Sequence, residues 1–407
     1  MGEKNHRRVL LITSWFPADV GRRGLINELA DAIADSNVDV DVIAVEWREI
    51  DISPNDSGSS HKPGVNVYRF KPLLFSSLGT FVGRIVKWAG TSLKAASTTS
   101  KLLRENNYDV VIAIAPSAVW APVLICHLFS RTKKYLIQWD FIPYHQRAMG
   151  LMSGGFSYQV LLLLERVLVR GFDVIGCMSP MNIEFLKKHY WVGARQKIEI
   201  LPIWAEAVFP EKIEREKIRE KYSLPQNMKI AVFGGTLSMG RGLDDVVAAA
   251  QFASDQSLNL MFLIIGRGPL EKQVRGLAEG IANIKVMSAI PRGDYLSLLA
   301  ACDCGIVATQ RDTGVPTFPS KTLDYFRAGI PVVASVESST DFGLFLEQRK
   351  AGVRIEAGDH IELMKVTSEV CTRLNGAMEY VRNGQRLIAE YFNVKLVVQQ
   401  ILVEQTP

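Results

Sequence analysis

The feature that most constrains the fold is an alternation of buried-strand and amphipathic-helix patterns that runs through the chain twice. The first series places strand-like apolar runs at residues 7–16, 38–47, 65–70, 108–117, 133–143, 172–180 and 197–204. The second places them at residues 229–236, 258–269, 284–290, 304–310 and 330–336. Strands that alternate with helices form right-handed βαβ units and parallel sheets. The sequence therefore predicts an α/β protein with two doubly wound parallel-sheet domains.

The length of the chain agrees with two domains. A chain of 407 residues is too long for one ordinary core. We predict a first domain over residues 1–205 and a second over residues 206–385. The charged segment at residues 211–229 is expected to be a surface connector followed by a short helix. Residues 386–407 have the apolar spacing of a final helix.

Cysteine usage and hydropathy predict a cytoplasmic protein. The five cysteines, at positions 126, 177, 302, 304 and 371, are odd in number and scattered, which indicates reduced thiols and no structural zinc. We find no apolar run long enough for a transmembrane helix. The apolar run after the first eight residues is too short for a signal peptide.

Positive charge is concentrated in one segment of the first half. The chain carries a net charge of +5, whereas residues 62–134 contain 11 Lys and Arg against Glu105 and Asp109, a local net charge of +9. Such a segment suits phosphate, nucleic acid or an acidic membrane, although an ordinary solvated face is an alternative. Residues 73–96 mix apolar side chains with Arg84, Lys87 and Lys94, which predicts docking at an anionic membrane surface. A buried domain helix would also explain them.

Glycine and arginine follow two strands of the second series. Ligands of open parallel sheets bind beyond the carboxyl ends of the strands. Gly235 allows close backbone approach there, and Arg241, just before a helix, can bridge phosphate oxygens. A solvated turn is the alternative for Arg241. Gly266 follows the next strand in "IGRGP", which lacks the third glycine of a dinucleotide site and is interpreted as a tight turn near the ligand.

The stretch "PSKTLDYFRAGIPVVA", residues 319–334, predicts an anion site at a helix start. We expect Pro319 at the first helical position, where its missing N–H costs nothing. Ser320, Lys321 and Thr322 would then offer N–H groups and a positive charge to phosphate. Asp324 lies one turn further on and suits neutral sugar hydroxyls. Together they predict a nucleoside diphosphate site, with a Lys–Asp surface pair as the alternative.

Two further clusters lie in the first half of the chain. Arg22, Arg23 and Gly24 follow the first strand, where they favour an anion, although a plain loop would also explain them. Asp140 directly follows another strand, with Trp139 and His145 close by. Acid, imidazole and aromatic groups in that place predict a sugar or acceptor platform. A structural role is equally open for His145.

These motifs resemble those of glycosyltransferase family 4, retaining enzymes with the GT-B fold of two facing Rossmann-like domains. The most specific block, residues 319–334, is similar to the family's PSKxxEYxAxGxPVVA pattern. Residues 233–242 resemble its glycine-rich segment with a basic residue, and residues 266–269 its GxGP turn. The segment at residues 386–407 resembles the family's last helix, which crosses back to the first domain.

The resemblance implies transfer of a sugar from a nucleotide-diphospho-sugar to an acceptor hydroxyl, in polysaccharide or glycolipid assembly at the inner face of the membrane. Asp140, Arg241 and Lys321 would be the catalytic residues. The two cations would neutralise the leaving diphosphate, so neither a metal nor another cofactor is expected. Asp324 would replace the second glutamate of the family's E-x7-E motif, whereas Pro316 stands where the first acid is expected. Asp312 is an acid nearby at a different spacing.

The expected partners follow from the same resemblance. They are a nucleotide-sugar donor, a lipid-linked or saccharide acceptor and an anionic membrane surface, and nucleic acid is not expected. Two alternatives remain at this point. One is a nucleotide-sugar epimerase of similar fold, and the other is a sugar-nucleotide-binding protein without catalytic activity.

Overall fold

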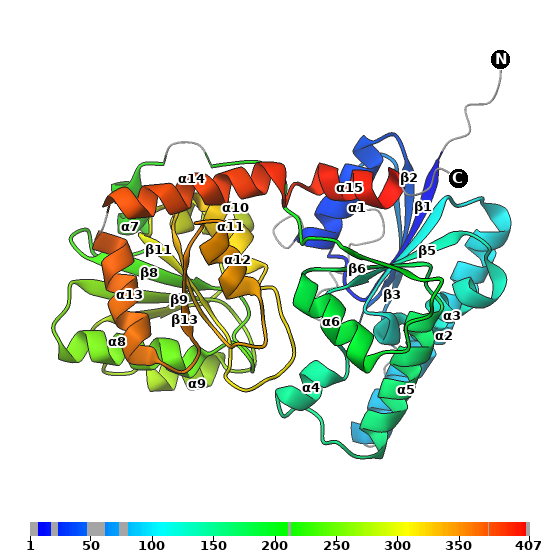
Figure 1. Ribbon diagram of the computed structural model, residues 1–407, viewed down its shortest axis with the longest axis horizontal. Helices are drawn as coiled ribbons and strands as arrows, with labels where there is room; N and C mark the ends of the chain where they lie inside the picture. Colours follow the sequence, from blue (N-terminus) through cyan, green and yellow to red (C-terminus); the bar gives the residue numbers. More distant parts are fainter. Residues whose placement is uncertain are drawn as a thin grey trace. The chain divides into compact units, whose positions relative to one another are not determined.

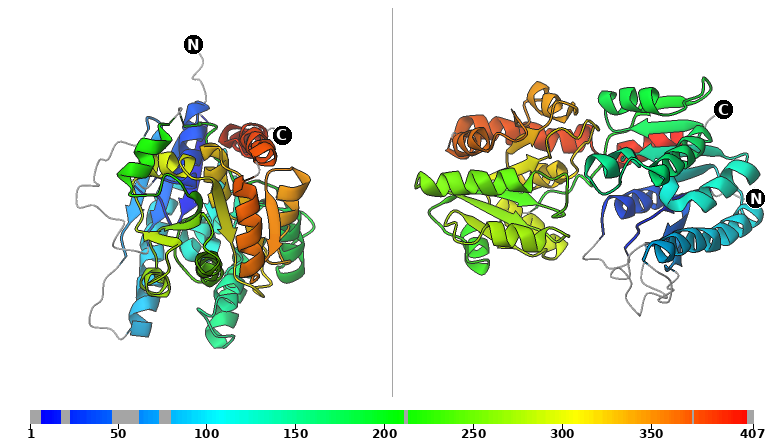
Figure 2. Two further views of the ribbon diagram at one scale, coloured as in Figure 1. Left: turned by 90° about the vertical axis from the view of Figure 1, so that its left-hand side faces the viewer. Right: turned by 90° about the horizontal axis from the view of Figure 1, so that it is seen from below.

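The computed structural model describes residues 7–17, 23–46, 62–72, 80–210, 213–372 and 374–403. The chain divides into two compact units. Unit 1 comprises Met1–Ile203 and Val394–Pro407, and unit 2 comprises Trp204–Asn393. Figures 1 and 2 show a sheet in each unit with helices on both of its faces. The predicted α/β architecture is therefore confirmed.

The sheet of unit 1 has seven strands in the order β3-β2-β1-β4-β5-β6-β7, and all of its pairings are parallel. The strands are β1 (Arg8–Thr13), β2 (Asp39–Val45), β3 (Val65–Phe70), β4 (Val110–Ile114), β5 (Lys133–Gln138), β6 (Val174–Cys177) and β7 (Lys197–Ile200). β1 is central, with Leu11 opposite Val42 on one side and Ile112 on the other. Strands covered on both faces must be apolar throughout, which is why these runs were visible in the sequence.

The helices of unit 1 are α1 (Leu25–Asp35), α2 (Thr80–Glu105), α3 (Trp120–Phe129), α4 (Tyr144–Ala148), α5 (Phe156–Arg170), α6 (Pro180–His189) and α15 (Val394–Val403), with a 3-10 turn, η3, at Pro116–Val119. α15 packs beside α1 although it lies at the other end of the chain (Figure 1). Arg7 donates to the carbonyl of Leu402 at 3.1 Å, and Gln400 donates to that of Ile200 at 2.9 Å. These bonds tie the C-terminal segment to the first sheet.

The sheet of unit 2 has six parallel strands in the order β10-β9-β8-β11-β12-β13. They are β8 (Lys229–Gly234), β9 (Leu260–Ile265), β10 (Ile284–Met287), β11 (Cys304–Ala308), β12 (Val332–Val336) and β13 (Val353–Glu356). The helices are α7 (Arg215–Lys221), α8 (Leu243–Asp255), α9 (Glu271–Leu277), α10 (Arg292–Ala300), α11 (Lys321–Ala328), α12 (Phe342–Gln348), α13 (His360–Thr372) and α14 (Leu374–Glu390). β13 was not anticipated, because this edge strand has only four residues and two of them are charged.

Two segments differ from what the sequence predicted. Residues 386–407, expected as one helix, span the end of α14, a break after Glu390 and the whole of α15. The connector at residues 211–229 is not purely a surface segment, because Arg219 of α7 is buried and donates to Asp303 at 2.8 Å. The buried guanidinium also donates to the carbonyls of Ala301 and Met228, so a charged residue here completes the fold.

All five cysteines are buried free thiols, as expected from their scattered positions. Among the described helices, none combines the length and the apolar character needed to cross a bilayer.

Candidate functional site

The strand order of unit 2 creates a switch point between β8 and β11. From β8 the chain continues outward through β9 and β10, and it returns to the other side of β8 with β11. Loops that leave in opposite directions open a ligand site at the carboxyl ends of the two strands. Gly242 lies where the two loops meet: its φ is 56°, and a Cβ added there would lie 2.8 Å from the carbonyl oxygen of Thr309. The sequence therefore needs glycine for this close approach.

Lys321 brings its ammonium group to this switch point. It is the first residue of α11, and its Nζ lies 3.2 Å from the ring centroid of Phe233 on β8. The Cβ position of Gly235 lies 3.8 Å from the same Nζ. Although part of the side chain is accessible, Nζ itself is buried and has no hydrogen-bond partner among the described residues.

Burial and a second cation disfavour the charged form of this lysine. They lower the pKa of Lys321 well below its ordinary value, with burial as the larger cause and the positive charge of Arg241 as the other. Arg241 lies in the loop between β8 and α8 and has no ion-pair partner in the part of the chain that the structure describes. A lysine and an arginine that lie side by side without a counter-charge suit an anion, which would favour the charged form of the lysine.

The helix start is two positions later than predicted. α11 begins at Lys321 with Ser320 as its N-cap, so Pro319 precedes the cap and does not occupy the first helical position. The reason is that the carbonyl of Pro319 accepts from the N–H of Thr322 at 3.3 Å, which starts the helix with a tight turn. Ser320 is exposed and makes no side-chain cap bond, and Thr322 Oγ1 is buried without a partner among the described residues.

Tyr325 fixes α11 over the sheet. Its hydroxyl accepts from the N–H of Gly234 at 2.9 Å and donates to the carbonyl of Ile306 at 3.0 Å. A Cβ at Gly305 would lie 2.4 Å from the Tyr325 ring, so the small residue makes room for it. This anchor holds Lys321, one turn earlier, at the ends of β8 and β11.

Gly266 shapes the loop that carries Gly235. A Cβ at Gly266 would lie 1.8 Å from the carbonyl oxygen of Gly235, and one at Gly268 would lie 2.1 Å from that of Leu237. The N–H of Gly235 donates to Ile265 and that of Leu237 to Arg267, both at 2.9 Å. The turn after β9 thus packs directly against the turn after β8.

Asp324 is held by an arginine that the sequence analysis missed. Arg292, the first residue of α10, donates to both carboxylate oxygens of Asp324, at 2.7 and 2.5 Å. Such a bidentate pair fixes the carboxylate in one orientation. The two residues are 32 positions apart on different helices, so no local pattern signals the pair.

A second residue that the sequence analysis missed is Glu337, an acid that directly follows β12. Its buried carboxylate accepts from the N–H of Thr313 at 2.8 Å and that of Gly314 at 3.3 Å, and from the Thr313 hydroxyl. The neighbouring Asp312 is exposed, with a φ of 58°. The carboxylate that orders the loop after β11 therefore comes from another strand.

In unit 1 the corresponding switch point lies between β1 and β4. The turn after β4 is capped by a buried acid, Glu165 of α5, whose Oε2 accepts from the N–H of Ser117 at 3.0 Å. Burial raises the pKa of Glu165 to about 7, and its hydrogen bonds with Ser117 limit the rise. Glu165 was not anticipated, because a lone acid within an apolar helix gives no sign of what it will face.

The raised pKa of Glu165 predicts a pH-dependent stability of unit 1. The folded carboxyl binds a proton more tightly than the unfolded one, so stability should fall as pH rises from about 4.5 to about 7. At pH 8, Glu165→Gln should be more stable than the wild type by roughly 3 kcal/mol. Urea unfolding at several pH values measures this. The exposed Glu184→Gln should retain the slope, and an equal slope for Glu165→Gln would contradict the assignment.

Asp140 and His145 lie together at the end of β5. The Asp140 side chain is 70% exposed, and its Oδ1 lies 3.7 Å from Nδ1 of the buried His145. Nδ1 accepts from the N–H of Phe141 at 3.0 Å, so His145 shapes the loop. Gln138 donates to the carbonyl of Asp140 at 2.6 Å, and Trp139 is half-buried beside it. Of this cluster, Asp140 is the group most accessible to a ligand.

The predicted loop after β1 is described only in part. Arg22 lies outside the described residues, whereas Arg23 pairs with Asp31 at 2.5 Å. Gly24 is the N-cap of α1, and its N–H donates to Asn27 at 3.2 Å. Gly24 belongs to unit 1, while the other predicted donor-binding residues all belong to unit 2. Among the described residues, no group of three His, Cys, Asp or Glu side chains is arranged to hold a metal ion.

Two parallel sheets with interleaved helices and a C-terminal helix that packs on the first unit define the GT-B class of glycosyltransferase folds. Within unit 2, residues 214–365 match the family model described as glycosyl transferases group 1.

Individual relatives agree with this class. The putative colanic acid biosynthesis glycosyl transferase WcaI of Escherichia coli is 23% identical over 246 residues, which cover 59% of this chain and 60% of the relative. The alignment thus spans less than two thirds of that protein. Sucrose-phosphate synthase of Thermosynechococcus elongatus superimposes with a TM-score of 0.73 at 16% identity, covering 98% and 99% of the two chains. HepE of Anabaena in complex with UDP-glucose does so with a TM-score of 0.71, with the same identity and coverage.

Proposed function

We propose that this chain transfers a sugar from a nucleotide-diphospho-sugar to an acceptor hydroxyl, with retention of the anomeric configuration, in polysaccharide or glycolipid assembly. The observation that carries the proposal is the buried, unpartnered Nζ of Lys321 beside Arg241 and Gly235, where an open sheet binds its ligand. Membership of family 4 is part of the proposal and rests on the block at residues 319–334.

The leaving group of such a transfer is a nucleoside diphosphate, which gains negative charge as the glycosidic bond breaks. Lys321 and Arg241 would bind its phosphate oxygens together with the N–H groups at the start of α11. This charge stabilisation is the role for which other enzymes use a metal ion, so we expect no metal requirement. Asp324, held by Arg292, would accept from the ribose hydroxyls.

The acceptor is assigned to unit 1. The exposed Asp140 at the end of β5 is the group proposed to meet the acceptor hydroxyl, with Trp139 beside it. We propose a lipid-linked or saccharide acceptor at the inner face of the plasma membrane. The name of WcaI refers to colanic acid biosynthesis, and HepE was crystallised with UDP and glucose and with UDP-glucose, which supports testing UDP-sugars first.

Incubation with UDP-, GDP- and ADP-sugars tests the reaction. Release of the nucleoside diphosphate, faster when a saccharide acceptor is added, is the expected result, with a rise in melting temperature for the matching nucleotide. Conversion of the donor to a sugar epimer would overturn the proposal in favour of an epimerase. Binding without turnover across acceptors would indicate a binding protein.

Arg292→Lys tests how the ribose is held. A lysine cannot replace the bidentate contact, so the Asp324 carboxylate should lose its fixed orientation. We expect the KM for the donor to rise about tenfold, with a smaller change in kcat. Arg275→Lys is the matched control, because Arg275 forms an exposed pair with Glu271. Equal KM values for the two variants would contradict the assigned role.

A further inference from the structure

One face of α5 carries an apolar stripe on the surface of unit 1. Phe156, Val160, Leu163 and Val167 are all exposed, Phe156 to 86%, and they lie within an arc of about 60° at 3.6 residues per turn. Helices of soluble proteins normally pack such a stripe against the core, whereas α5 buries Leu162, Leu168 and Val169 on its other side. Its exposed face is therefore built for a further contact.

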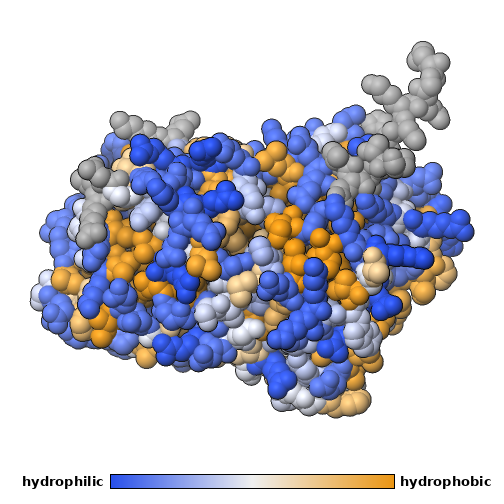
Figure 3. Space-filling model, in the orientation of Figure 1, coloured by the Kyte–Doolittle hydropathy of each residue, from blue (hydrophilic) through white to orange (hydrophobic). Residues whose placement is uncertain are grey.

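The stripe is extended at both ends by apolar residues. Leu151 is exposed just before α5 begins. At the other end, His127 of α3 bonds the carbonyl of Leu168 at 2.9 Å, which brings the exposed Leu128 and Phe129 near the last turn of α5. Figure 3 shows apolar side chains gathered on the lower right of the molecule, in the region where Figure 1 labels α3 and α5.

The charges around the stripe are mostly positive. Residues 110–173, every one of which the structure describes, contain six Lys and Arg and three acids. Of these acids, Glu165 is fully buried, Asp140 lies at the carboxyl end of β5, and Asp173 lies 3.8 Å from Lys134. Arg170 is exposed and continues the same helical face as the apolar stripe, one turn after Val167.

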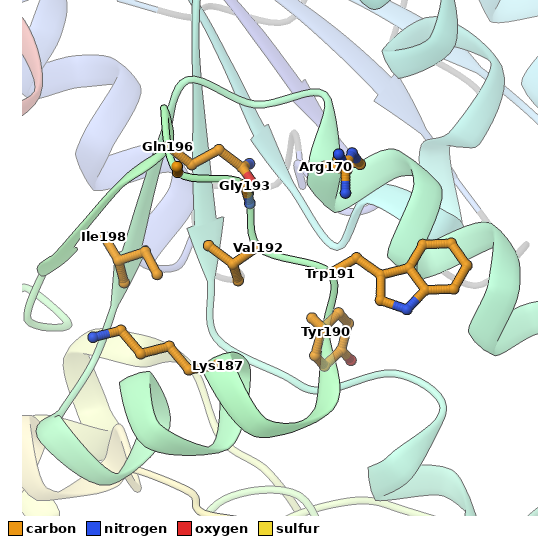
Figure 4. Close-up of a pocket in the computed structure, with 9 residues that line it drawn as sticks. Arg170, Lys187, Tyr190, Trp191, Val192, Gly193, Gln196 and Ile198 are labelled. Atoms are coloured by element: carbon orange, nitrogen blue, oxygen red, sulfur yellow. Dashed lines mark hydrogen bonds between the residues drawn. The ribbon is translucent and has the colours of Figure 1, made fainter.

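Arg170 also lines an open pocket of about 680 Å³ at the end of α5. Figure 4 shows Arg170 and Lys187 on opposite sides of this pocket, with Val192 between them and Ile198 on the side of Lys187. Trp191 lies at its edge and is 44% exposed, with the Arg166 guanidinium 5.6 Å from its ring centroid. No lining residue carries a carboxylate. Two cations and an amphipathic aromatic ring suit an anionic headgroup at a membrane interface.

We propose that the α5 stripe docks unit 1 on an anionic membrane and that the pocket between Arg170 and Lys187 takes the phosphate of a lipid headgroup. The charge pattern favours this partner over a second copy of the chain. An isologous contact would bring the same mainly basic patch together, in which the cations outnumber the exposed acids Asp140 and Asp173. An anionic bilayer supplies both an apolar layer and negative charge.

This docking surface differs from the segment predicted from the sequence, residues 73–96. Of residues 73–96, the part up to residue 87 lies outside the side chains that the structure describes. Further along, Trp88 donates to the carbonyl of Ser117 at 3.2 Å and packs on Trp120, while Thr91, Ser92 and Ala95 are buried. One face of this portion of α2 therefore packs in the interior of unit 1, whereas Leu93 and Lys94 are exposed.

The proposal rests on the proposed function and deepens it, because the first turn of α5 contacts the segment that follows Asp140. Arg147 of α4 lies over the Tyr158 ring at 5.2 Å, and α4 follows Asp140 in the chain. A helix that docks by this face would hold the acceptor region beside the lipid layer.

Flotation of the full chain with vesicles tests the docking surface. We expect binding to phosphatidylglycerol-containing vesicles and little binding to pure phosphatidylcholine. Phe156→Gln with Leu163→Gln should weaken binding more than tenfold. Arg170→Gln with Lys187→Gln should weaken it about 20-fold at low salt and less at high salt. The matched control is Leu277→Gln with Met378→Gln, which removes two exposed apolar side chains of unit 2.

The outcomes separate this inference from the proposed function. All four residues are exposed, so their variants should keep the circular dichroism and melting temperature of the wild type. These variants should also release the nucleotide from a soluble donor at the wild-type rate. If the wild type itself released no nucleotide, that result would contradict the proposed function and leave the docking surface untouched. Wild-type flotation of both double variants would overturn the docking surface. A reduced oligomeric mass of the stripe variant in light scattering would reassign the stripe to self-association and overturn it as well.

Discussion

Lys321→Met should lower the turnover of a nucleotide-sugar about 100-fold and should also stabilise unit 2. The loss of turnover follows from removing the cation that meets the diphosphate. The gain in stability follows because Nζ is buried without a partner and beside the charge of Arg241. We expect the free energy of unfolding without ligand to rise by about 1 kcal/mol. Steady-state kinetics and urea unfolding measure the two effects on one preparation.

The exposed Lys272→Met is the matched control for this substitution. It removes a lysine from α9 in the same unit and should change neither quantity. If Lys321→Met and the control turned over the donor at the same rate, the proposed anion site would have no role in the donor reaction. A loss of turnover together with a large loss of stability would instead mean that the lysine supports the fold.

Gly266→Ala should damage both the fold of unit 2 and its use of the donor. The new Cβ would lie 1.8 Å from the carbonyl oxygen of Gly235 and 3.0 Å from its carbonyl carbon, and this backbone cannot move aside as the end of a flexible side chain could. We expect a loss of about 3 kcal/mol in unfolding free energy. In the protein that remains folded, displacement of the Gly235 loop by about 1 Å should lower kcat/KM for the donor about 100-fold.

Gly276→Ala provides the comparison within the same unit. Gly276 lies in α9, and a Cβ there would meet no atom within 4 Å. Alanine favours the helix over glycine, so this variant should gain about 0.5 kcal/mol and retain its activity. If the two glycine variants behaved alike, close packing of the turn after β9 against that after β8 would be refuted.

The alternation of apolar runs and amphipathic helices predicted the two parallel sheets, because strands buried on both faces have to be apolar along their length. It missed β13, where Arg354 and Glu356 interrupt the pattern at the sheet edge. The break between α14 and α15 was also hidden, because helical spacing continues across residues 391–393. Patterns of this kind report burial more reliably than they report where an element ends.

In the proposed donor site, Gly235, Gly266 and Lys321 could be picked out because each directly follows a strand or begins a helix. Arg241 could be picked out because it directly precedes the N-cap of α8. Strand order then decides that the loops after β8 and β11 meet, although they are far apart in the sequence. Arg292 and Glu337 could not be anticipated, because each meets its partner only through tertiary packing. The same holds for the apolar stripe of α5, whose residues read like an ordinary core-facing helix.

The sequence by itself determined the secondary-structure elements, the parallel α/β class and the residue types available to bind an anion, because periodicity and local chemistry are properties of neighbours along the chain. Only the tertiary structure decided that the ammonium of Lys321 is buried beside Arg241 and that Asp324 is held by Arg292. It also decided that α5 presents an apolar face outward. Burial, pairing and exposure depend on which distant segments pack together, and no local pattern carries that information.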